Sequence, residues 1–470
     1  MLRVTVLERG RLIRADDTAD GGAHETGTPS RRRLPADLYD RLFRAESARE
    51  ERGESAVFSW RRNYCLGGPW VGVMQVPGLQ VEILPKTDEH EVPADEGFVK
   101  DTRCNLMEML LRGGLGAVRA RGLADLSLKR GTLHDQLVDA FLDRALYELR
   151  RGVDRGYLAE ESNLGTLRGK LLLSRHVARN SAQKHRFYCR HDVLSEAMPI
   201  SRRLKQACRL LAGRTLSAGL HVKCNQVLAQ LDDVPEQSAR LHEPDPIFNR
   251  QNERFEDIYA FARMLIEGQA ADARAGDVET FSLLFDMDQV FERYIAAFLA
   301  THVIPRVAGA SLFPQAKGHR FSLYRDGDGA GREDVLRLAP DLLFTLDGPG
   351  GRRTLIIDTK WKRLSDKHAA RPSNDDLYQL YAYLHRYDCD RAFLLYPHTD
   401  GVSTRDLDAL ARHAGTRVGT VGVRFVDLRH RLWTNSGRAA LAQQLETIVR
   451  EGFALQLTDS EALVSVGGGS

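Results

Sequence analysis

The chain has 470 residues, of which 43% are hydrophobic and 28% are charged. That length is enough for two or three domains, and the composition is typical of a globular protein that buries a core. The formal net charge of +3 excludes a global positive field as the basis of nucleic-acid binding, so any such contact needs local basic patches.

Six cysteines are spread through the chain without a Cys-x-x-Cys pair or a regular spacing, which disfavours both a disulfide framework and a zinc site. The first residues carry arginines and aspartates and lack a long apolar run, so we expect neither a signal peptide nor a transmembrane helix. These features predict a cytoplasmic protein with reduced thiols and no membrane contact.

Residues 1–98 predict a β-rich N-terminal domain. Pro77 and Gly78 form a strong turn signal between two apolar runs. Four such runs are typical of strands, at residues 2–7, 12–14, 71–76 and 79–84. The polar residues 15–35 predict a loop, and residues 35–52 predict a helix.

Residues 99–275 predict a helical middle region. Apolar residues recur with helical spacing at 102–111, 133–150, 201–211 and 255–266. The stretch from Gly165 to Leu171 resembles a phosphate-binding loop, but too few residues separate its glycines, and Leu171 stands where Ser or Thr would bind magnesium. We therefore predict that this chain binds no nucleotide and that any nucleotide hydrolysis belongs to a partner.

A basic cluster lies in the same region, with Phe187 and Tyr188 interleaved. Its candidate nucleic-acid contacts are Arg168, Lys170, Arg175, Lys184 and Arg186. Lys and Arg side chains bind phosphate backbones by displacing condensed counterions. A protein-docking surface and a solvated face are equally compatible with this composition.

Residues 276–456 predict an α/β domain, which a tail at 457–470 follows. A β-hairpin is expected where the apolar runs 342–346 and 354–357 flank a turn of Gly, Pro and Arg. The other expected elements are helices at 286–299, 374–384 and 438–450 and strands at 391–396 and 421–426. Asn374 or Asp375 is the expected N-cap of the second helix.

The hairpin is expected to bring two acids together. Asp341 opens its first strand and Asp358 ends its second, so an ordinary antiparallel register places these carboxylates near each other. Side chains alternate between the faces of a strand, so Asp358 and Lys360 should point one way and Thr359 the other. The spacing predicts two carboxylates and one ammonium in a small space.

Such a group suits metal-assisted attack of water on a phosphodiester. Adjacent carboxylates repel unless a cation neutralises them, and Mg²⁺ prefers one or two carboxylates with water and phosphate. We predict that Asp341, Asp358 and the carbonyl of Thr359 face the metal. Lys360 would orient or deprotonate the water, or screen charge at the phosphate. Glu292 and Gln379, on the flanking helices, are auxiliary candidates.

The order of helix, hairpin, helix and strand, with these residues in place, resembles the core of the PD-(D/E)XK, or restriction-endonuclease-like, nucleases. The residues that carry the resemblance are Glu292, Asp341, Asp358, Thr359, Lys360 and Gln379. Together with the stretches 75–86, 282–292 and 378–379, they also resemble the McrC family, the nuclease subunit of McrBC-type modification-dependent (type IV) restriction systems.

This resemblance implies a Mg²⁺-dependent endodeoxyribonuclease subunit that cleaves double-stranded DNA containing modified cytosine. The subunit would act when docked on an McrB-like AAA+ GTPase hexamer, which recognises the modified base, and it would stimulate the GTPase. The parts of McrC-like proteins before the nuclease domain contact the motor, so residues 1–98 and 99–275 would dock on it.

Two other functions remain open at this point. The chain could be a regulatory adaptor of the motor that keeps a nuclease fold as a scaffold, since residues before 276 carry no recognisable chemistry. It could also be a stand-alone PD-(D/E)XK repair nuclease. A missing carboxylate-dependent metal site would favour the adaptor, and the absence of a co-purifying AAA+ protein would favour the repair nuclease.

Overall fold

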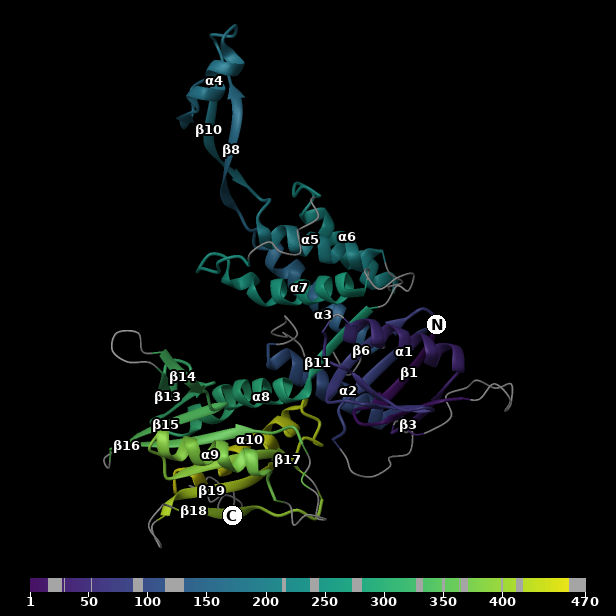
Figure 1. The fold of residues 1–470 in the computed structure, drawn as a ribbon, viewed down its shortest axis with the longest axis vertical. Helices are drawn as coiled ribbons and strands as arrows, with labels where there is room; N and C mark the ends of the chain where they lie inside the picture. The colour runs from purple at the N-terminus through teal and green to yellow at the C-terminus, as the bar shows by residue number, and fades with distance from the viewer. Residues whose placement is uncertain are drawn as a thin grey trace, which may run out of the picture. The chain divides into compact units, whose positions relative to one another are not determined.

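The protein is a mixed α/β chain with several separate sheets, seen in a computed structural model (Figure 1). The structure describes residues 1–15, 28, 30–51, 53–87, 96–114, 131–213, 217–236, 245–272, 281–326, 333–348, 351–362, 364, 371–398, 400–410 and 417–455. The chain divides into two compact units. The first holds residues 1–115, 119–133 and 275–470, and the second holds residues 116–118 and 134–274.

The N-terminal part of the first unit holds two four-stranded sheets and one helix. The first sheet has the order β1 (Leu2–Leu7), β7 (Leu79–Leu84), β6 (Trp70–Val76) and β11 (Phe281–Asp286). The second has the order β3 (Arg31–Leu34), β2 (Arg11–Arg14), β5 (Tyr64–Gly67) and β4 (Phe58–Trp60). Both sheets and helix α1 (Ala36–Glu51) share one hydrophobic core, so these elements fold as a single body.

A glycine in β6 lets the distant strand β11 join this sheet. Gly72 has a φ of 132°, and a Cβ atom there would lie 2.0 Å from the carbonyl oxygen of Leu283. Only glycine accepts both the backbone angle and the close approach. The chain thus returns to the N-terminal sheet just before it enters helix α8 (Met287–Phe298).

A six-stranded sheet forms the other part of the first unit. Its order is β12 (Ala310–Pro314), β15 (Leu342–Gly348), β16 (Gly351–Thr359), β17 (Arg391–Pro397), β19 (Arg417–Val426) and β18 (Arg405–Leu410). Strands β16, β17 and β19 are parallel neighbours, and the other pairs are antiparallel. A separate pair, β13 (Phe321–Asp326) and β14 (Glu333–Leu338), lies in the chain between β12 and β15.

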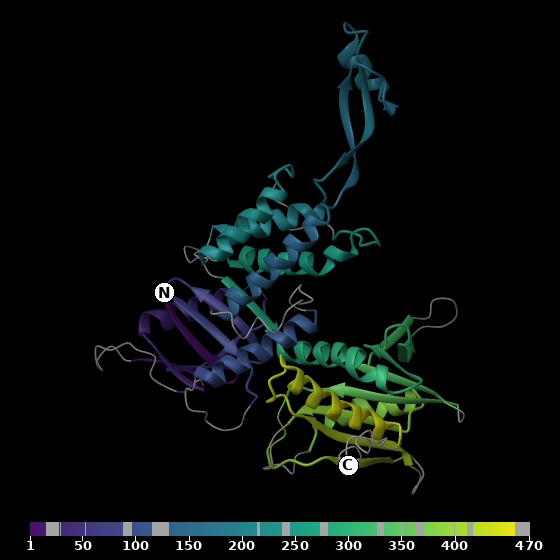
Figure 2. The same cartoon turned by 180° about the vertical axis from the view of Figure 1, so that it is seen from behind.

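Helices cover both faces of the six-stranded sheet (Figures 1 and 2). Helix α9 (Asn374–Arg386) shares a core with Ile356 on one face. Helix α10 (Asn435–Gly452) lies on the other, where Gly452 packs against Leu355. Because side chains alternate along a strand, Asp358 and Lys360 lie on the same face as Ile356, toward α9.

Helix α2 (Glu96–Arg112) ties the two parts of the first unit together. Asn105, which is buried, donates from its amide nitrogen to the carbonyl oxygens of Leu428 and His430, each at 3.0 Å. Its amide oxygen accepts from the backbone N–H of Leu432 at 2.8 Å. One side chain therefore holds the segment that leads into α10.

The second unit is a set of helices with a projecting arm (Figures 1 and 2). The helices are α3 (Leu133–Arg150), α5 (Pro199–Ala212), α6 (Ala218–Gln230) and α7 (Glu256–Asp272). The arm is built from β8 (Gly156–Leu164), β9 (Lys170–Leu171), helix α4 (Leu173–Asn180) and β10 (Phe187–Ser195). No helix in the described part of the chain combines the length and the apolar composition needed to cross a lipid bilayer.

Most predicted elements are confirmed, including the 342–357 hairpin and the helices that flank it. The loop prediction for residues 15–35 is wrong at β3, where Leu34 is buried and Arg32 donates to the carbonyl oxygen of Thr5. Residues 16–27 and 29 lie outside the described part. The N-cap of α9 is Ser373 and not Asn374 or Asp375.

The prediction of a helical middle region is wrong for the arm. Strands β8 and β10 pair over nine residues each, and β8 is mostly exposed along its length. Such a strand is stabilised by its backbone ladder and needs no apolar alternation, which is the signal that sequence analysis relies on. Helix α6 was also absent from the prediction.

Candidate functional site

The open end of the β15–β16 hairpin holds Asp341 and Thr359. Leu342 pairs with Ile357, so Asp341 lies opposite Asp358 at the point where the ladder ends. The Oδ2 atom of Asp341 accepts two hydrogen bonds from Thr359, at 2.8 Å from its backbone N–H and at 2.7 Å from its hydroxyl. The Asp341 carboxylate therefore turns toward Thr359 beyond the last paired residue of the hairpin.

Asp358 and Lys360 form a buried ion pair. The side chain of Asp358 is 1% exposed, and its Oδ2 atom lies 2.7 Å from Nζ of Lys360. The same ammonium donates to Oε1 of Gln379 at 3.3 Å, and the Gln379 amide donates onward to the hydroxyl of Tyr383 at 2.8 Å. Lys360 is therefore held from two sides, by Asp358 on β16 and by Gln379 on α9.

Burial and mutual repulsion shape the charges of these acids. Burial raises the pKa of Asp358 to about 7, and the negative charge of Asp341 adds to the effect. Burial also raises the pKa of Asp341, despite the hydrogen bonds from Thr359. Ionisation of both carboxylates is therefore unfavourable unless a positive charge lies close to them.

Lys360 supplies one positive charge beside these carboxylates. Burial alone would lower its pKa, but the neighbouring carboxylates, Asp358 above all, outweigh burial and raise the pKa. At neutral pH the side chain is therefore an ammonium in this arrangement. It acts as a fixed positive charge and hydrogen-bond donor.

Glu292 lies on α8, one step removed from this group. Its Oε1 atom accepts from the side-chain amide of Gln315 at 3.1 Å. Burial raises the pKa of Glu292, and the charge of Asp341 raises it further. Direct contacts thus join Asp341 to Thr359, and they join Asp358, Lys360 and Gln379. The charge of Asp341 links these two groups and Glu292 electrostatically.

Two acids near the site were missing from the sequence prediction. Asp376 is buried on α9, 3.7 Å from Nζ of Lys360, and it accepts from Lys362 at 2.5 Å. Asp288 on α8 accepts from the backbone N–H of Trp361 at 3.0 Å. Asp376 precedes Gln379 by three residues, so helical spacing places both on one face and could have identified it.

The acids that could hold a metal are Asp341 and Asp358. No group of three or more His, Cys, Asp and Glu residues with the spacing of a metal cage occurs in the described ranges. A site for a hard cation here would rest on two carboxylates completed by water, as Mg²⁺ accepts and as Zn²⁺ in a structural site does not.

The predicted nucleic-acid residues lie on the arm of the second unit. Arg168, Lys170, Arg175, Lys184 and Arg186 are all exposed. Arg175 forms an ion pair with Glu161, and its guanidinium lies over the ring of Tyr188, 5.9 Å from the centroid. Tyr188 itself is buried, so its ring packs inside the arm and leaves the basic side chains as the exposed surface.

The family model described as "McrBC 5-methylcytosine restriction system component" matches residues 67–397. No curated protein matches the chain.

Solved structures also resemble the chain. One chain of the refined half-complex from a tetradecameric assembly of Thermococcus gammatolerans McrB AAA+ hexamers with bound McrC is 17% identical, with a TM-score of 0.59 over 95% of this chain and 100% of that one. A second, from the Thermococcus gammatolerans McrBC complex, is 19% identical, with a TM-score of 0.44 over 64% of this chain and 88% of that one. The family match spans most of the sequence, and the chain belongs to the McrBC 5-methylcytosine restriction system components.

Proposed function

We propose that this chain is the Mg²⁺-dependent DNA endonuclease subunit of its restriction system. The observation that carries the proposal is the group formed by the buried Asp358 with the half-buried Asp341 and Lys360 at the open end of one hairpin. Buried acids whose pKa values are raised by burial and by one another are typical of functional sites.

The arrangement of the surrounding elements supports a PD-(D/E)XK fold for residues 276–456. Asp341 directly precedes β15, Asp358 lies on β16, and the parallel neighbour β17 follows. Helices α8 and α9 bring Glu292 and Gln379 from either side of the hairpin in the sequence. In this reading, residues 1–98 and 99–275 are accessory domains that serve docking.

The residues present fit a magnesium ion held by Asp341 and Asp358, with the Thr359 carbonyl as a further oxygen. When bound, such an ion supplies a Lewis acid for the phosphate and an activated water. Thr359 fixes the rotamer of Asp341 through its two hydrogen bonds. Lys360, kept as an ammonium by its neighbours, orients the water or stabilises the charge on the phosphate, and Gln379 holds Lys360 in place.

A motor partner follows from the family and from the chain's own chemistry. The stretch from Gly165 to Leu171 runs from the end of β8 through β9 in the arm, whereas a phosphate loop connects a strand to a helix. The similar solved structure contains McrB AAA+ hexamers with bound McrC. We infer that this chain docks on an AAA+ GTPase hexamer of the McrB kind, and that the complex acts on DNA with modified cytosine.

The arm is the element we assign to that docking. Large apolar side chains are exposed along it, at Tyr157 (73%), Leu167 (60%), Leu173 (67%), Val177 (65%) and Leu194 (54%). A soluble monomer gains nothing from exposing a set of apolar side chains, whereas a partner that covers them gains hydrophobic stabilisation. The basic side chains beside them would add electrostatic attraction to an acidic partner surface.

The direct test is DNA cleavage by the Asp358→Ala variant with its AAA+ partner, GTP, Mg²⁺ and methylated DNA. Loss of an outer-shell partner of a metal costs about 10- to 100-fold in activity, so loss of a ligand should cost at least about 100-fold. The matched control is Asp347→Ala, which removes an exposed acid from the same hairpin.

Cleavage by the Asp347→Ala variant should equal that of the unmodified protein. Wild-type cleavage by Asp358→Ala would refute the nuclease assignment and favour the adaptor function.

A further inference from the structure

The turn after β12 lies at the same edge of the six-stranded sheet as Asp341 and Asp358. Strand β12 pairs with β15 in antiparallel register, and its last residue, Pro314, lies opposite Leu342. The next residue, Gln315, donates its backbone N–H to the carbonyl oxygen of Asp341 at 2.6 Å. Asp341 therefore lies between Asp358 on the β16 side and Gln315 on the β12 side.

The side chain of Gln315 extends from this turn to helix α8. Its Nε2 atom donates to Oε1 of Glu292 at 3.1 Å. Within the described part of the chain, no other hydrogen bond and no ion pair involves the Glu292 side chain, so its second carboxylate oxygen is free. Gln315 thus connects the backbone of Asp341 with the carboxylate of Glu292.

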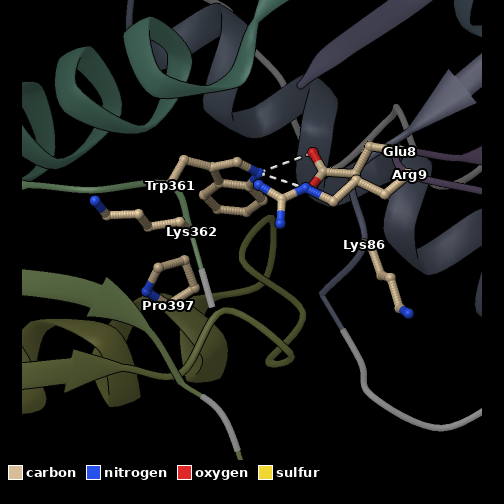
Figure 3. A pocket seen from close by; sticks show the side chains of 6 residues that line it. All are labelled: Glu8, Arg9, Lys86, Trp361, Lys362 and Pro397. Carbon is tan, nitrogen blue, oxygen red and sulfur yellow. Dashed lines mark hydrogen bonds between the residues drawn. The ribbon is translucent and has the colours of Figure 1, made fainter. Parts of the chain in front are cut away.

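The other acid on α8 already holds a neighbouring part of the site. Asp288 precedes Glu292 by one helical turn, so the two lie on one face of the helix. Asp288 accepts from the backbone N–H of Trp361 at 3.0 Å. The indole N–H of Trp361 donates to both oxygens of Glu8, at 3.0 and 2.8 Å (Figure 3). Asp288 therefore fixes the residue that follows Lys360, and Glu292 is the acid of α8 that has a free oxygen.

Glu292 is close enough to the candidate site to feel its charges. Burial raises the pKa of Glu292 and the charge of Asp341 raises it further, whereas the hydrogen bond from Gln315 and the charge of Lys360 oppose both effects. Among the residues that the structure describes, no three acids are grouped closely enough to hold a metal directly. Because Mg²⁺ keeps several of its waters when it binds to protein, Glu292 would contact such a water and not the ion.

The backbone of this turn has an unfavourable conformation. Gln315 has a φ of 50° and Ala316 a φ of 45°, both in the left-handed region that glycine and asparagine prefer. Ala316 is fully buried in the core that contains Ile356 and Leu380, which anchors the turn. Gln315 is exposed, so packing does not account for a glutamine at this position. Strained backbone of this kind clusters at functional sites.

We propose that Gln315 is a positioning residue of the nuclease site. It fixes the Glu292 carboxylate relative to Asp341, so that the free oxygen of Glu292 can accept a hydrogen bond from a water of the magnesium site. The proposal rests on the proposed nuclease function and adds to it a residue that is neither an acid nor the lysine. Residues that orient the outer contacts of a metal site contribute to metal affinity.

The test is a double-mutant cycle of Gln315→Gly and Glu292→Ala, measured by calorimetric titration of Mg²⁺ into the full chain. Glycine adopts the left-handed φ without strain, so Gln315→Gly should melt at about the temperature of the unmodified chain. Loss of an outer contact of a metal site costs about 10- to 100-fold in affinity, so we expect about tenfold weaker Mg²⁺ binding by each single variant. Because Gln315 acts through Glu292, the double variant should bind Mg²⁺ no more weakly than Glu292→Ala alone.

Cleavage of methylated DNA together with the AAA+ partner gives a second readout. Gln315→Gly should lower kcat about tenfold and leave KM for DNA unchanged, because Gln315 acts on the metal's surroundings and not on DNA binding. Ala316→Gly is the matched control, since it places an equally flexible residue in the same turn and keeps the Gln315 amide. It should bind Mg²⁺ and cleave DNA as the unmodified chain does.

Unchanged Mg²⁺ affinity in Gln315→Gly would overturn the inference. So would losses that add in the double variant, or an equal loss in Ala316→Gly, because the amide contact with Glu292 would then not be the cause. If the unmodified chain binds Mg²⁺ and cleaves DNA, these results contradict only the role of Gln315. An unmodified chain without carboxylate-dependent Mg²⁺ binding would contradict the nuclease proposal, and the role of Gln315 with it.

Discussion

At the residue scale, the central feature is Lys360, whose positive charge is stabilised by the carboxylates around it. Asp358, Asp376 and Gln379 all contact the Lys360 ammonium, and the carboxylates keep its pKa raised although the side chain is largely buried. A buried carboxylate pair without a cation would lose several kcal/mol to desolvation. Lys360 therefore serves both the stability of the hairpin end and the chemistry that we assign to it.

A second buried acid makes a stability prediction that is independent of function. Glu46 on α1 is fully buried and accepts from the backbone N–H groups of Val57 and Phe58. Burial raises its pKa in the folded state above the usual value of 4.5. Above pH 4.5, Glu46 therefore keeps its proton more readily in the folded chain than in the unfolded chain. For this residue, the free energy of unfolding falls as the pH rises above 4.5.

Glu46→Gln keeps an acceptor oxygen but carries no charge. We expect the Gln variant to lack this part of the pH dependence. The difference between its melting temperature and that of the unmodified chain should therefore shift in favour of the variant as the pH rises from 4.5 to 8. Glu46→Ala, which leaves two buried N–H groups without their acceptor, should cost about 1–3 kcal/mol for each of them. Circular dichroism melts at several pH values measure both effects, and parallel pH profiles for Gln and Glu would contradict the argument.

At the element scale, the arm is a defined structure that carries an apolar surface. Asn163 on β8 and Asn180 on α4 exchange side-chain amide hydrogen bonds at 2.9 and 2.8 Å, which fixes α4 against the strands. Leu173 and Val177 lie one helical turn apart on α4 and are both exposed. The helix thus presents a fixed pair of apolar side chains to a partner.

Replacing both with serine, in a Leu173→Ser and Val177→Ser double variant, should leave the fold intact, because exposed substitutions change stability by about 0.5 kcal/mol or less. Binding to the AAA+ partner, measured by pull-down or interferometry, should weaken at least about tenfold, and stimulation of its GTPase should fall with it. Val222→Ser, at an exposed apolar position on α6, is the control. Unchanged partner binding by the double variant would rule out α4 as a docking helix.

The same scale shows what the sequence can and cannot predict. The 342–357 hairpin was predictable because two apolar runs flank a turn, and the assumption of an ordinary antiparallel register placed Asp341 opposite Asp358. The strands of the arm were not predictable, because exposed strands lack the alternation of apolar and polar residues that marks a half-buried strand. The hydrogen bonds between Trp361 and Glu8 were not predictable either, because no local pattern encodes a tertiary contact.

At the scale of the whole molecule, the two units have different chemistry. The first contains the acid–lysine group, and the second contains the arm. Strand β11 enters the N-terminal sheet directly before α8, and Asn105 clamps the segment before α10, so the N-terminal part and the six-stranded sheet support each other. We therefore expect the effects of substitutions in the arm and in the site on the free energy of unfolding to add, because the two lie in separate compact units.

The most direct test of the central claim is calorimetric titration of Mg²⁺ into the full chain and into Asp341→Asn, with Asp347→Asn as the control. Asp341 and Asp358 should bind one divalent ion, so we predict a saturable heat for the unmodified chain and the control, and its loss in Asp341→Asn. Equal Mg²⁺ binding by Asp341→Asn and the unmodified chain, or no carboxylate-dependent binding at all, would contradict the account.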